Sequence, residues 1–306
     1  MLRSLARRVN KAPFTSNVDR VEILDDGKLR VTEGFLPLLR ANGLHSFDKI
    51  MACSGGTMMR SVPGRSTVKI ELPRPDGGTQ VAFLKRYEPE YLSSGKKLLR
   101  LLHWPGADDE ALHEWNCIRV LRDAGFNTAA LIAVGQERGA GIVRRSFLLT
   151  AEIAGGIAAH DYVRTLKVKA RRELALQIAD LARRFHGAGF AHKDHYLSHI
   201  FIVPSGSPTT APDYYYIDLQ RLIRPRLFQT RWVIKDLAVL GYSALLSGAT
   251  RADLMRFCHA YFQRSRLTAD DRRLIRSVMS RVNGLRQRRP KYDVIWDQPG
   301  VHPPNV

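Results

Sequence analysis

The order of strand and helix patterns along the chain is the feature that most restricts its fold. Between about residues 49 and 153, short apolar and β-branched runs alternate with glycine-containing turns, and one helical pattern lies among them. Beyond residue 153 the patterns are mostly helical and are interrupted by one polar loop and one hairpin. This order predicts an α+β fold of two lobes, in which a small antiparallel sheet with one helix precedes a larger helical lobe.

The expected boundaries divide the chain into three regions. Residues 1–40 carry little pattern and are expected to form an N-terminal extension, residues 41–153 the first lobe, and residues 154–306 the second lobe with a basic C-terminal tail. The expected strands of the first lobe are Lys49–Cys53, Thr67–Leu72, Val81–Tyr87, Leu131–Gly135 and Phe147–Ile153. Its one expected helix, Asp109–Arg122, ends before Gly125.

The second lobe is expected to be built mainly from helices. They cover Arg171–His186, Trp232–Leu246, Ala252–Gln263 and Asp270–Arg286. A hairpin of Ile200–Val203 and Tyr214–Asp218 separates the first two of these, and Thr268 is the expected N-cap of the last.

The polar segment between His186 and Ile200 is the most informative part of the sequence. It contains His192-Lys193-Asp194, which is similar to the His-Arg-Asp loop of protein kinases with lysine in place of arginine. The similarity implies that Asp194 is the catalytic residue, a carboxylate that orients the attacking hydroxyl group. The alternative is an aspartate that only caps a turn, and the helix before the loop and the strand after it favour the catalytic interpretation.

Phosphoryl transfer also needs a cation on the phosphates of ATP, and Lys85 in the third expected strand is the candidate. Glu114 shares a helical face with Cys117, Ile118 and Leu121. A buried carboxylate needs a partner, because an unpaired buried charge is unfavourable. We therefore predict that Glu114 forms an ion pair with Lys85 and positions it in a nucleotide site. Taken alone, Lys85 is better explained as a surface lysine on a strand edge, and the acid on the inward helical face changes that balance.

The candidate ligands for Mg²⁺ are Asp218 and His199. Asp218 follows the hairpin, 24 residues after Asp194, at the place of the aspartate of the Asp-Phe-Gly motif. His199 stands five residues after Asp194, where protein kinases have an asparagine that binds Mg²⁺. Imidazole is a poor ligand for Mg²⁺, which prefers oxygen, so either the metal site relies more heavily on Asp218 or His199 contacts phosphate instead.

Two further predictions concern residues around this site. Gly55 and Gly56 lie between the first two expected strands, where a glycine-rich phosphate loop belongs, although the spacing is not that of the G-x-G-x-x-G motif. Asp236 is an acid within an apolar helix, and an aspartate at this place in kinases hydrogen-bonds the backbone of the catalytic loop. Gly55 and Gly56 are therefore nucleotide-binding candidates, and Asp236 is expected to be structural.

The histidines of the polar segment allow another interpretation. His192, His195 and His199 are spaced by three and four residues, which also suits zinc ligands. Neither helical presentation nor a clear fourth ligand accompanies them, so we prefer the kinase interpretation.

The charge of the chain predicts an anionic partner. Lys and Arg number 48 against 29 Asp and Glu, a formal net charge of +19. No nucleic-acid-reading motif accompanies this charge, so no specific nucleic acid is expected. The three scattered cysteines favour a reducing compartment, and no run approaches the roughly eighteen apolar residues of a spanning helix.

Beyond its kinase motifs, the chain resembles the family of lipopolysaccharide core heptose kinases and Kdo kinases. The resemblance lies in His192-Lys-Asp-His-Tyr-Leu-Ser-His and Tyr216-Ile-Asp-Leu-Gln-Arg, and more loosely in Phe83-Leu-Lys and His113-Glu-Trp. It implies a protein-kinase-like fold, with ATP and Mg²⁺ as cofactors. The implied reaction phosphorylates a heptose or Kdo hydroxyl of the lipopolysaccharide inner core, a strongly anionic glycolipid.

The resemblance also implies a cytoplasmic protein that makes peripheral contact with the inner membrane on its cytoplasmic face. Arg221, Arg224, Arg226 and Arg231 follow Asp218 in the sequence and are candidates to bind the acceptor. Two alternatives stay open from the residues alone: a kinase of this fold with another acceptor, such as a protein Tyr or Ser or a small-molecule sugar, and a basic non-catalytic pseudokinase.

Overall fold

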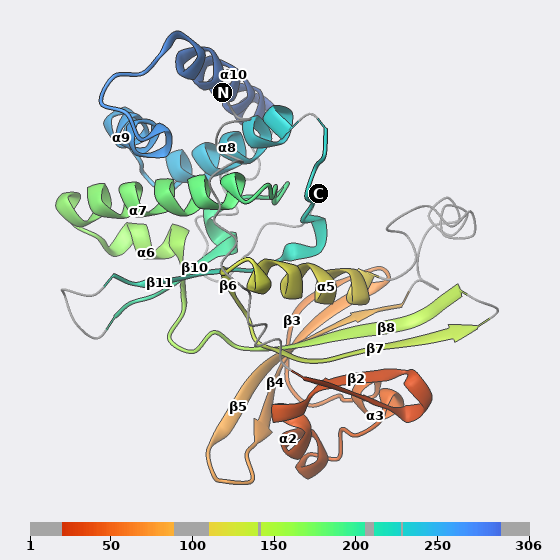
Figure 1. Cartoon of the computed structure of the whole chain (residues 1–306). Helices are drawn as coiled ribbons and strands as arrows, with labels where there is room; N and C mark the ends of the chain where they lie inside the picture. Colours follow the sequence, from red (N-terminus) through yellow and green to blue (C-terminus); the bar gives the residue numbers. More distant parts are fainter. Residues whose placement is uncertain (1–19, 89–109, 140–141, 206–210, 228, 289–306) are drawn as a thin grey trace. The chain divides into compact units, whose positions relative to one another are not determined.

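The computed structural model describes residues 20–88, 110–139, 142–205, 211–227 and 229–288 (Figure 1). The chain divides into two compact units. The β-rich unit comprises the described residues up to Ala154 together with Asp218–Gln220. The helical unit comprises Gly155–Ile217 and the described residues from Arg221 onward. The part of the expected N-terminal extension before Arg20 and the part of the expected basic tail after Arg288 lie outside the described residues.

A seven-stranded antiparallel sheet forms the β-rich unit, in the order β1-β2-β7-β8-β5-β4-β3. The strands are β1 (Val21–Leu24), β2 (Leu29–Thr32), β3 (Thr57–Val62), β4 (Arg65–Pro73), β5 (Thr79–Tyr87), β7 (Leu131–Gly139) and β8 (Ile142–Ala151). A two-residue strand, β6 (Asn127–Thr128), follows the helix α5. Short 3-10 turns occur in both units: η1 (Asp25–Gly27) and η2 (Glu33–Phe35) in the β-rich unit, η4 (Leu197–His199) in the helical unit, and η5 (Leu219–Arg221) where the chain passes from one unit to the other.

Helices cover both faces of the sheet. Helix α5 (Glu110–Asp123) packs on β5, β7 and β8, whereas α2 (Leu36–Ala41) and α3 (Phe47–Met51) lie on the other side (Figure 1). The core on the α2 and α3 side includes Leu39, Phe47, Leu84 and Phe147, all of them without solvent exposure. Because the central strand β8 is covered on both faces, its residues Phe147–Ala151 are all buried and show no alternation.

The structure differs from the sequence expectations at the start of the chain. Residues 20–40, expected within the N-terminal extension, supply β1, β2 and all of α2 except Ala41 in the β-rich unit. The expected strand Lys49–Cys53 is wrong, since Phe47–Met51 is a helix whose Phe47, Ile50 and Met51 share one buried face. The strand that precedes β4 and pairs with it is instead β3 (Thr57–Val62). Its side chains are nearly all exposed and lack an alternating pattern.

Because the first strand of this pair begins at Thr57, the two candidate glycines do not lie in the turn between β3 and β4. Gly55 and Gly56 precede β3, and the turn between β3 and β4 contains Gly64, with φ of 80°. Gly56 has a φ of 124°, and a Cβ atom there would come within 2.3 Å of the Lys69 carbonyl oxygen on β4. Gly56 is therefore required where the chain enters the sheet, which is a packing reason for a glycine at this position.

The helical unit consists of five helices and a small sheet among its described residues. The helices are α6 (Ala159–Thr165), α7 (Val168–Gly187), α8 (Gln229–Leu246), α9 (Arg251–Phe262) and α10 (Ala269–Arg288). Helix α7 contacts α9, and α8 contacts α10. Strand β10 (Ile200–Val203) pairs antiparallel with β11 (Asp213–Tyr216) and β9 (Ile157–Ala158).

The helix and hairpin predictions for this unit are confirmed. The predicted stripe of α7, which includes Leu174, Ile178 and Phe185, is buried. The Thr268 hydroxyl accepts a hydrogen bond from the Asp271 N–H at 3.2 Å, and the Asp271 carboxylate accepts one from the Thr268 N–H at 2.9 Å. Thr268 is thus the predicted N-cap of α10, in a reciprocal capping arrangement.

Candidate active site

The predicted ion pair between Lys85 and Glu114 is present in the β-rich unit. Lys85 extends from β5, and its Nζ lies 2.6 Å from Oε1 of Glu114 on α5. Glu114 is only 2% exposed, so the pair lies in a low-dielectric setting. Its second oxygen, Oε2, accepts hydrogen bonds from the Tyr87 hydroxyl at 3.2 Å and from the Gln220 side-chain amide at 3.1 Å. The lone acid on an apolar helical face therefore has a full set of partners.

Asp218 belongs to the same unit as Lys85 and Glu114. Its backbone has a φ of 53°, in the left-handed region that a residue with a side chain rarely adopts. Two residues further on, Gln220 bonds to Tyr87, Glu114 and Arg65. Arg65, Tyr87 and Gln220 are not among the predicted site residues, because their contacts join distant parts of the sequence and leave no local pattern.

In the helical unit, Asp236 holds the loop that carries Asp194. Asp236 lies on α8 with no solvent exposure, and its two carboxylate oxygens accept the backbone N–H groups of His192 at 2.6 Å and of Lys193 at 2.8 Å. Lys193 has a φ of 70°, another left-handed residue. The prediction that Asp236 hydrogen-bonds this loop is confirmed, and the two bonds fix a backbone turn that Lys193 would otherwise avoid.

The Asp194 carboxylate forms an ion pair within the same unit. Its Oδ1 accepts a hydrogen bond from Nη1 of Arg221 at 2.9 Å, and the Asp194 side chain is 22% exposed. Arg221 is one of the four arginines expected to bind the acceptor, and the structure places it on Asp194. Arg224, Arg226 and Arg231 are exposed, with the guanidinium of Arg224 over the Phe190 ring and that of Arg231 over the Trp232 ring.

His199 is oriented by the backbone of the loop. Its Nδ1 lies 2.7 Å from the Asp194 carbonyl oxygen. Because a carbonyl oxygen can only accept, Nδ1 carries the hydrogen, and in the neutral ring the lone pair is on Nε2. His199 is nearly buried, at 9% exposure.

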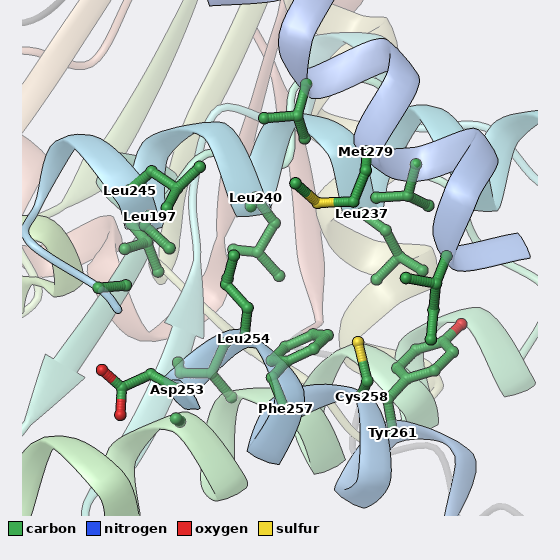
Figure 2. Close-up of a pocket in the computed structure, with 18 of the residues that line it drawn as sticks. Leu197, Leu237, Leu240, Leu245, Asp253, Leu254, Phe257, Cys258, Tyr261 and Met279 are labelled. Atoms are coloured by element: carbon green, nitrogen blue, oxygen red, sulfur yellow. The ribbon is translucent and has the colours of Figure 1, made fainter. Parts of the chain in front are cut away.

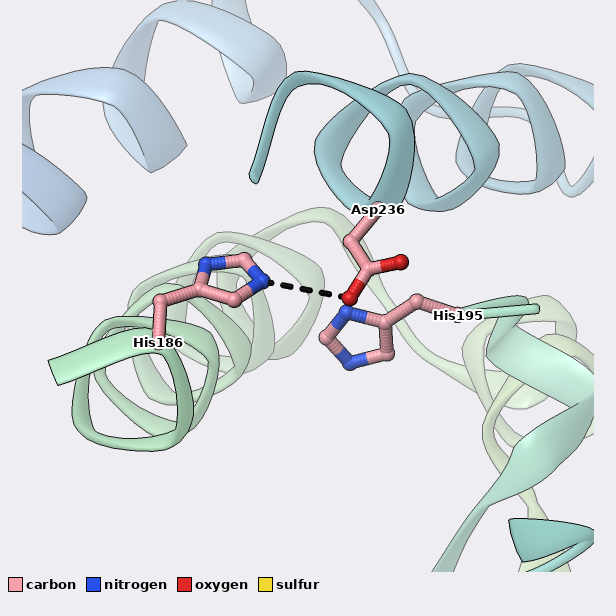
Figure 3. Close-up of side chains that lie close together, drawn as sticks. All are labelled: His186, His195 and Asp236. Carbon is pink, nitrogen blue, oxygen red and sulfur yellow. Dashed lines mark ion pairs between the residues drawn. The ribbon is translucent and has the colours of Figure 1, made fainter. Parts of the chain in front are cut away.

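A cluster of two histidines and one aspartate lies behind the loop. Figure 3 shows His186 from α7 and His195 from the loop on either side of Asp236. His186 Nε2 lies 3.5 Å from Asp236 Oδ2, and its Nδ1 lies 2.9 Å from the Tyr261 hydroxyl. Burial raises the pKa of Asp236, but the hydrogen bond from His186 and the charges of His195, His186 and His192 lower it to about 2. Burial holds the pKa of His195 well below its usual value.

This arrangement does not match the zinc interpretation of the loop histidines. His192 Nε2 bonds to the Ile217 carbonyl oxygen and His199 Nδ1 to the Asp194 carbonyl oxygen, so the ring nitrogens of the three histidines do not converge. The candidate ligand atoms that lie within 4.8 Å of one another belong instead to His186, His195 and Asp236. Since both Asp236 oxygens already accept backbone N–H groups, the cluster is best explained as support for the loop.

An apolar cavity lies within the helical unit. It has a volume of about 120 Å³ and lies among helices α7, α8, α9 and α10 (Figure 2). Leu240, Leu254, Phe257 and Met279 are among the side chains around it. Within the described ranges, no helix combines the length and apolar character needed to cross a bilayer.

Comparisons with known proteins show which proteins this chain is similar to. The model of the Lipopolysaccharide kinase (Kdo/WaaP) family matches residues 93–261. Lipopolysaccharide core heptose(I) kinase WaaP of Escherichia coli is 29% identical over 242 residues, which are 76% of this chain and 87% of that protein. The protein of the same name from Pseudomonas aeruginosa is 30% identical over 261 residues, 82% of this chain and 94% of the relative.

A solved structure is similar over almost its whole length. It is described as WaaP in complex with acyl carrier protein, has 26% sequence identity to this chain and gives a TM-score of 0.60. The match covers 89% of this chain and 98% of that structure's chain. The predicted α+β, protein-kinase-like fold is thereby confirmed.

We predict that replacing Asp236 by Asn lowers the free energy of unfolding by about 3 kcal/mol at pH 7, because buried backbone N–H groups and His186 lose a charged partner. The unfolded-state pKa of Asp is about 3.9. Since the folded-state pKa of Asp236 is about 2, the stability from this group is complete above pH 4 and is lost as the pH falls toward 2. Urea denaturation of wild type and Asp236→Asn between pH 7 and pH 2 measures both effects.

The stability of the wild type should therefore fall faster than that of the Asn variant between pH 4 and pH 2, by about 2 kcal/mol in total. Asp213→Asn, an exposed aspartate of the same unit, is the matched control and should behave as wild type. Equal stability of Asp236→Asn and wild type at pH 7 would contradict the prediction.

Proposed function

The chain belongs to the lipopolysaccharide kinase (Kdo/WaaP) family, and we propose that it transfers phosphate from ATP to a heptose hydroxyl of the lipopolysaccharide inner core. Membership in this kinase family makes it a phosphotransferase that acts on a hydroxyl group. The observation that carries the proposal is the ion pair of Lys85 on β5 with the buried Glu114 on α5, the arrangement that positions the phosphate-binding lysine in kinases. Heptose is proposed rather than Kdo because the relatives are named heptose(I) kinases.

The side chains present fit ATP and Mg²⁺ by their chemistry. Lys85 would hold the phosphates as a cation, and Asp218 offers the carboxylate oxygens that Mg²⁺ prefers. When bound, Mg²⁺ neutralises phosphate charge. We propose Asp218 as the principal metal ligand and His199 as a further ligand or phosphate contact through Nε2. Gly55 and Gly56 stay weaker candidates for nucleotide contact, since Gly56 already has a packing reason to be glycine.

Asp194 is the residue we propose to act on the acceptor. Arg221 holds Oδ1 of its carboxylate at 2.9 Å, and we assign the hydroxyl proton to Oδ2. Asp236 fixes the backbone from which Asp194 extends, so the orientation of the carboxylate is set before the acceptor arrives.

We propose that Arg224, Arg226 and Arg231 bind the anionic groups of the acceptor. Guanidinium groups form paired hydrogen bonds with carboxylates and phosphates, and an aromatic ring beneath Arg224 and Arg231 leaves the edge of the group available for such bonds. Contact with the cytoplasmic face of the inner membrane would then come through the lipid-linked acceptor. A kinase acting on another acceptor and a non-catalytic binding protein are the alternatives that the experiments below separate.

A second proposal concerns the apolar cavity. The similar solved structure is WaaP in complex with acyl carrier protein, and the match covers 89% of this chain and 98% of that structure's chain. An acyl chain is a flexible apolar ligand, and the cavity among α7 to α10 is lined almost entirely by apolar side chains (Figure 2). We propose that this chain binds an acyl carrier protein and places the acyl group in the cavity.

We predict that Asp194→Ala reduces phosphate transfer from labelled ATP to purified lipopolysaccharide core about 1000-fold, because a general base contributes on this scale. ATP binding should be unchanged. Asp213→Ala is the matched control and should transfer at the wild-type rate. A core truncated before the heptose should accept no phosphate from the wild type.

Three results would contradict this prediction in different ways. Transfer retained by Asp194→Ala would remove Asp194 from the reaction. Wild type that binds ATP but transfers nothing to the core would point to another acceptor. Wild type without ATP affinity would support a non-catalytic protein.

We predict that the double variant Arg224→Ala, Arg226→Ala raises the KM for the lipopolysaccharide acceptor about tenfold and leaves the KM for ATP unchanged, since two charge-assisted contacts are removed. Steady-state kinetics with each substrate varied in turn measures the two constants. Arg276→Ala with Arg281→Ala, two exposed arginines of α10, removes the same charge elsewhere and should change neither constant. Equal increases in both KM values would contradict a role in acceptor binding.

We predict that wild type binds an acylated carrier protein at least tenfold more tightly than the unacylated form, because each buried CH₂ group contributes about 0.8 kcal/mol. Ala244→Phe, which fills the cavity from α8, should abolish this difference in calorimetric titrations. Ala252→Phe, on the exposed side of α9, is the control and should retain it. No preference for the acylated form in the wild type would exclude the cavity as the acyl site.

A further inference from the structure

The side chain of Gln220 joins three elements of the β-rich unit. Its Nε2 donates hydrogen bonds to the Tyr87 hydroxyl at 3.0 Å and to Glu114 Oε2 at 3.1 Å. Its Oε1 accepts a hydrogen bond from Arg65 Nη1 at 2.9 Å. Arg65 lies at the start of β4, Tyr87 at the end of β5 and Glu114 on α5.

The chemistry of these partners selects an amide at position 220. Tyr87 donates its hydroxyl hydrogen to Glu114, so toward Gln220 it acts as an acceptor. Glu114 is a carboxylate and only accepts, whereas Arg65 only donates. Among side chains of this length, a glutamate would face Glu114 with like charge, and a lysine would face Arg65 with like charge. Glutamine donates to one side and accepts from the other.

Gln220 stands two residues after Asp218 on a short and restrained segment. Asp218 adopts a left-handed backbone conformation, with a φ of 53°, which is unfavourable for a residue with a Cβ atom. Leu219, between them, is 1% exposed. A residue that anchors position 220 therefore limits how the Asp218 carboxylate can be presented.

The surroundings of Arg65 connect the same groups electrostatically. Its guanidinium lies 5.5 Å from the centre of the Tyr87 ring. Burial lowers the pKa of Arg65, but its electrostatic interactions with Tyr87, Asp218 and Glu114 outweigh this effect and raise it. Arg65 is thus held charged beside Asp218 and Glu114, at the start of the strand that follows the Gly64 turn.

We propose that Gln220 is a positioning residue that fixes Asp218 relative to the Lys85–Glu114 pair. Glu114 binds Lys85 through Oε1 and Gln220 through Oε2, so one buried carboxylate orients both the proposed phosphate ligand and the segment of the proposed metal ligand. This inference rests on the proposed function only in that Asp218 binds Mg²⁺ and Lys85 binds nucleotide. It needs no particular acceptor.

The test is the binding of a non-hydrolysable ATP analogue to the full chain by calorimetry, without acceptor, at limiting and saturating Mg²⁺. Gln220→Met keeps the length of the side chain and removes all three hydrogen bonds. We expect it to weaken analogue binding about tenfold at limiting Mg²⁺, with partial recovery at saturating Mg²⁺, because Asp218 is no longer held in place. Gln136→Met, the same change on β7, is the control and should bind as wild type.

Gln220→Glu provides a second readout that simple loss of packing would not give. Ionised glutamate can still accept the hydrogen bond from Arg65 but faces Glu114 with like charge, whereas protonated glutamate regains a donor toward Glu114 or Tyr87. The ratio of variant to wild-type affinity should therefore rise as the pH falls from 8 to 5.5. Thermal unfolding of each variant shows whether the chain is folded under the conditions used.

The outcomes separate this inference from the proposed function. Wild-type binding by folded Gln220→Met, or an equal loss in Gln136→Met, overturns the role of Gln220 while leaving the proposed function intact. A pH-independent ratio for Gln220→Glu also overturns it. Normal binding results with no transfer to any lipopolysaccharide core leave the inference standing and remove the acceptor assignment. Absence of Mg²⁺-dependent binding in the wild type overturns both.

Discussion

The buried carboxylate of Asp236 is the interaction on which the helical unit depends. A carboxylate without solvent exposure is strongly unfavourable unless hydrogen bonds replace its water, and here two backbone N–H groups and His186 do so. The same bonds hold Lys193, immediately before Asp194, in a left-handed conformation. Asp194 in turn supplies the carbonyl oxygen that orients the His199 ring. Asp236 thus positions the backbone of His192 and Lys193, and the Asp194 carbonyl oxygen positions the His199 ring.

Glu114 has the corresponding place in the β-rich unit, but it works differently. Asp236 binds backbone groups and thereby fixes a local conformation. Glu114 binds the side chains of Lys85, Tyr87 and Gln220, which come from two separate parts of the chain, and thereby fixes the relation of α5 to β5 and to the Asp218 segment. Removing either acid would leave several buried partners unsatisfied, so the effects of substitutions within each network should not be additive.

The sequence predicted the parts of the fold and site that have a local signature. Helical periodicity gave α7 and the other long helices, and the single acids among apolar residues at 114 and 236 indicated buried polar contacts that the structure contains. Strand β3 has no such signature, because it is an exposed edge strand without alternation. Lys49–Cys53 was misassigned as a strand because a short, mostly apolar segment fits either structure, and only the burial of Ile50 and Met51 as part of helix α3 decides. The contacts of Gln220 join positions 65, 87, 114 and 220, and no local pattern relates them.

The positive charge of the chain shows why composition alone could not identify a ligand. Many arginines are engaged with acids of the protein itself: Arg145 pairs with Asp48 and Glu137, Arg183 and Arg184 with Asp180, and Arg221 with Asp194. These charges offer little attraction to an external anion. Arg224 and Arg231 lie instead over aromatic rings, which restrain the guanidinium without neutralising it. An arginine held in this way keeps its charge and loses less conformational entropy when an anion binds. The segment after Asp218 is therefore better suited to an anionic acceptor than its share of the net charge suggests.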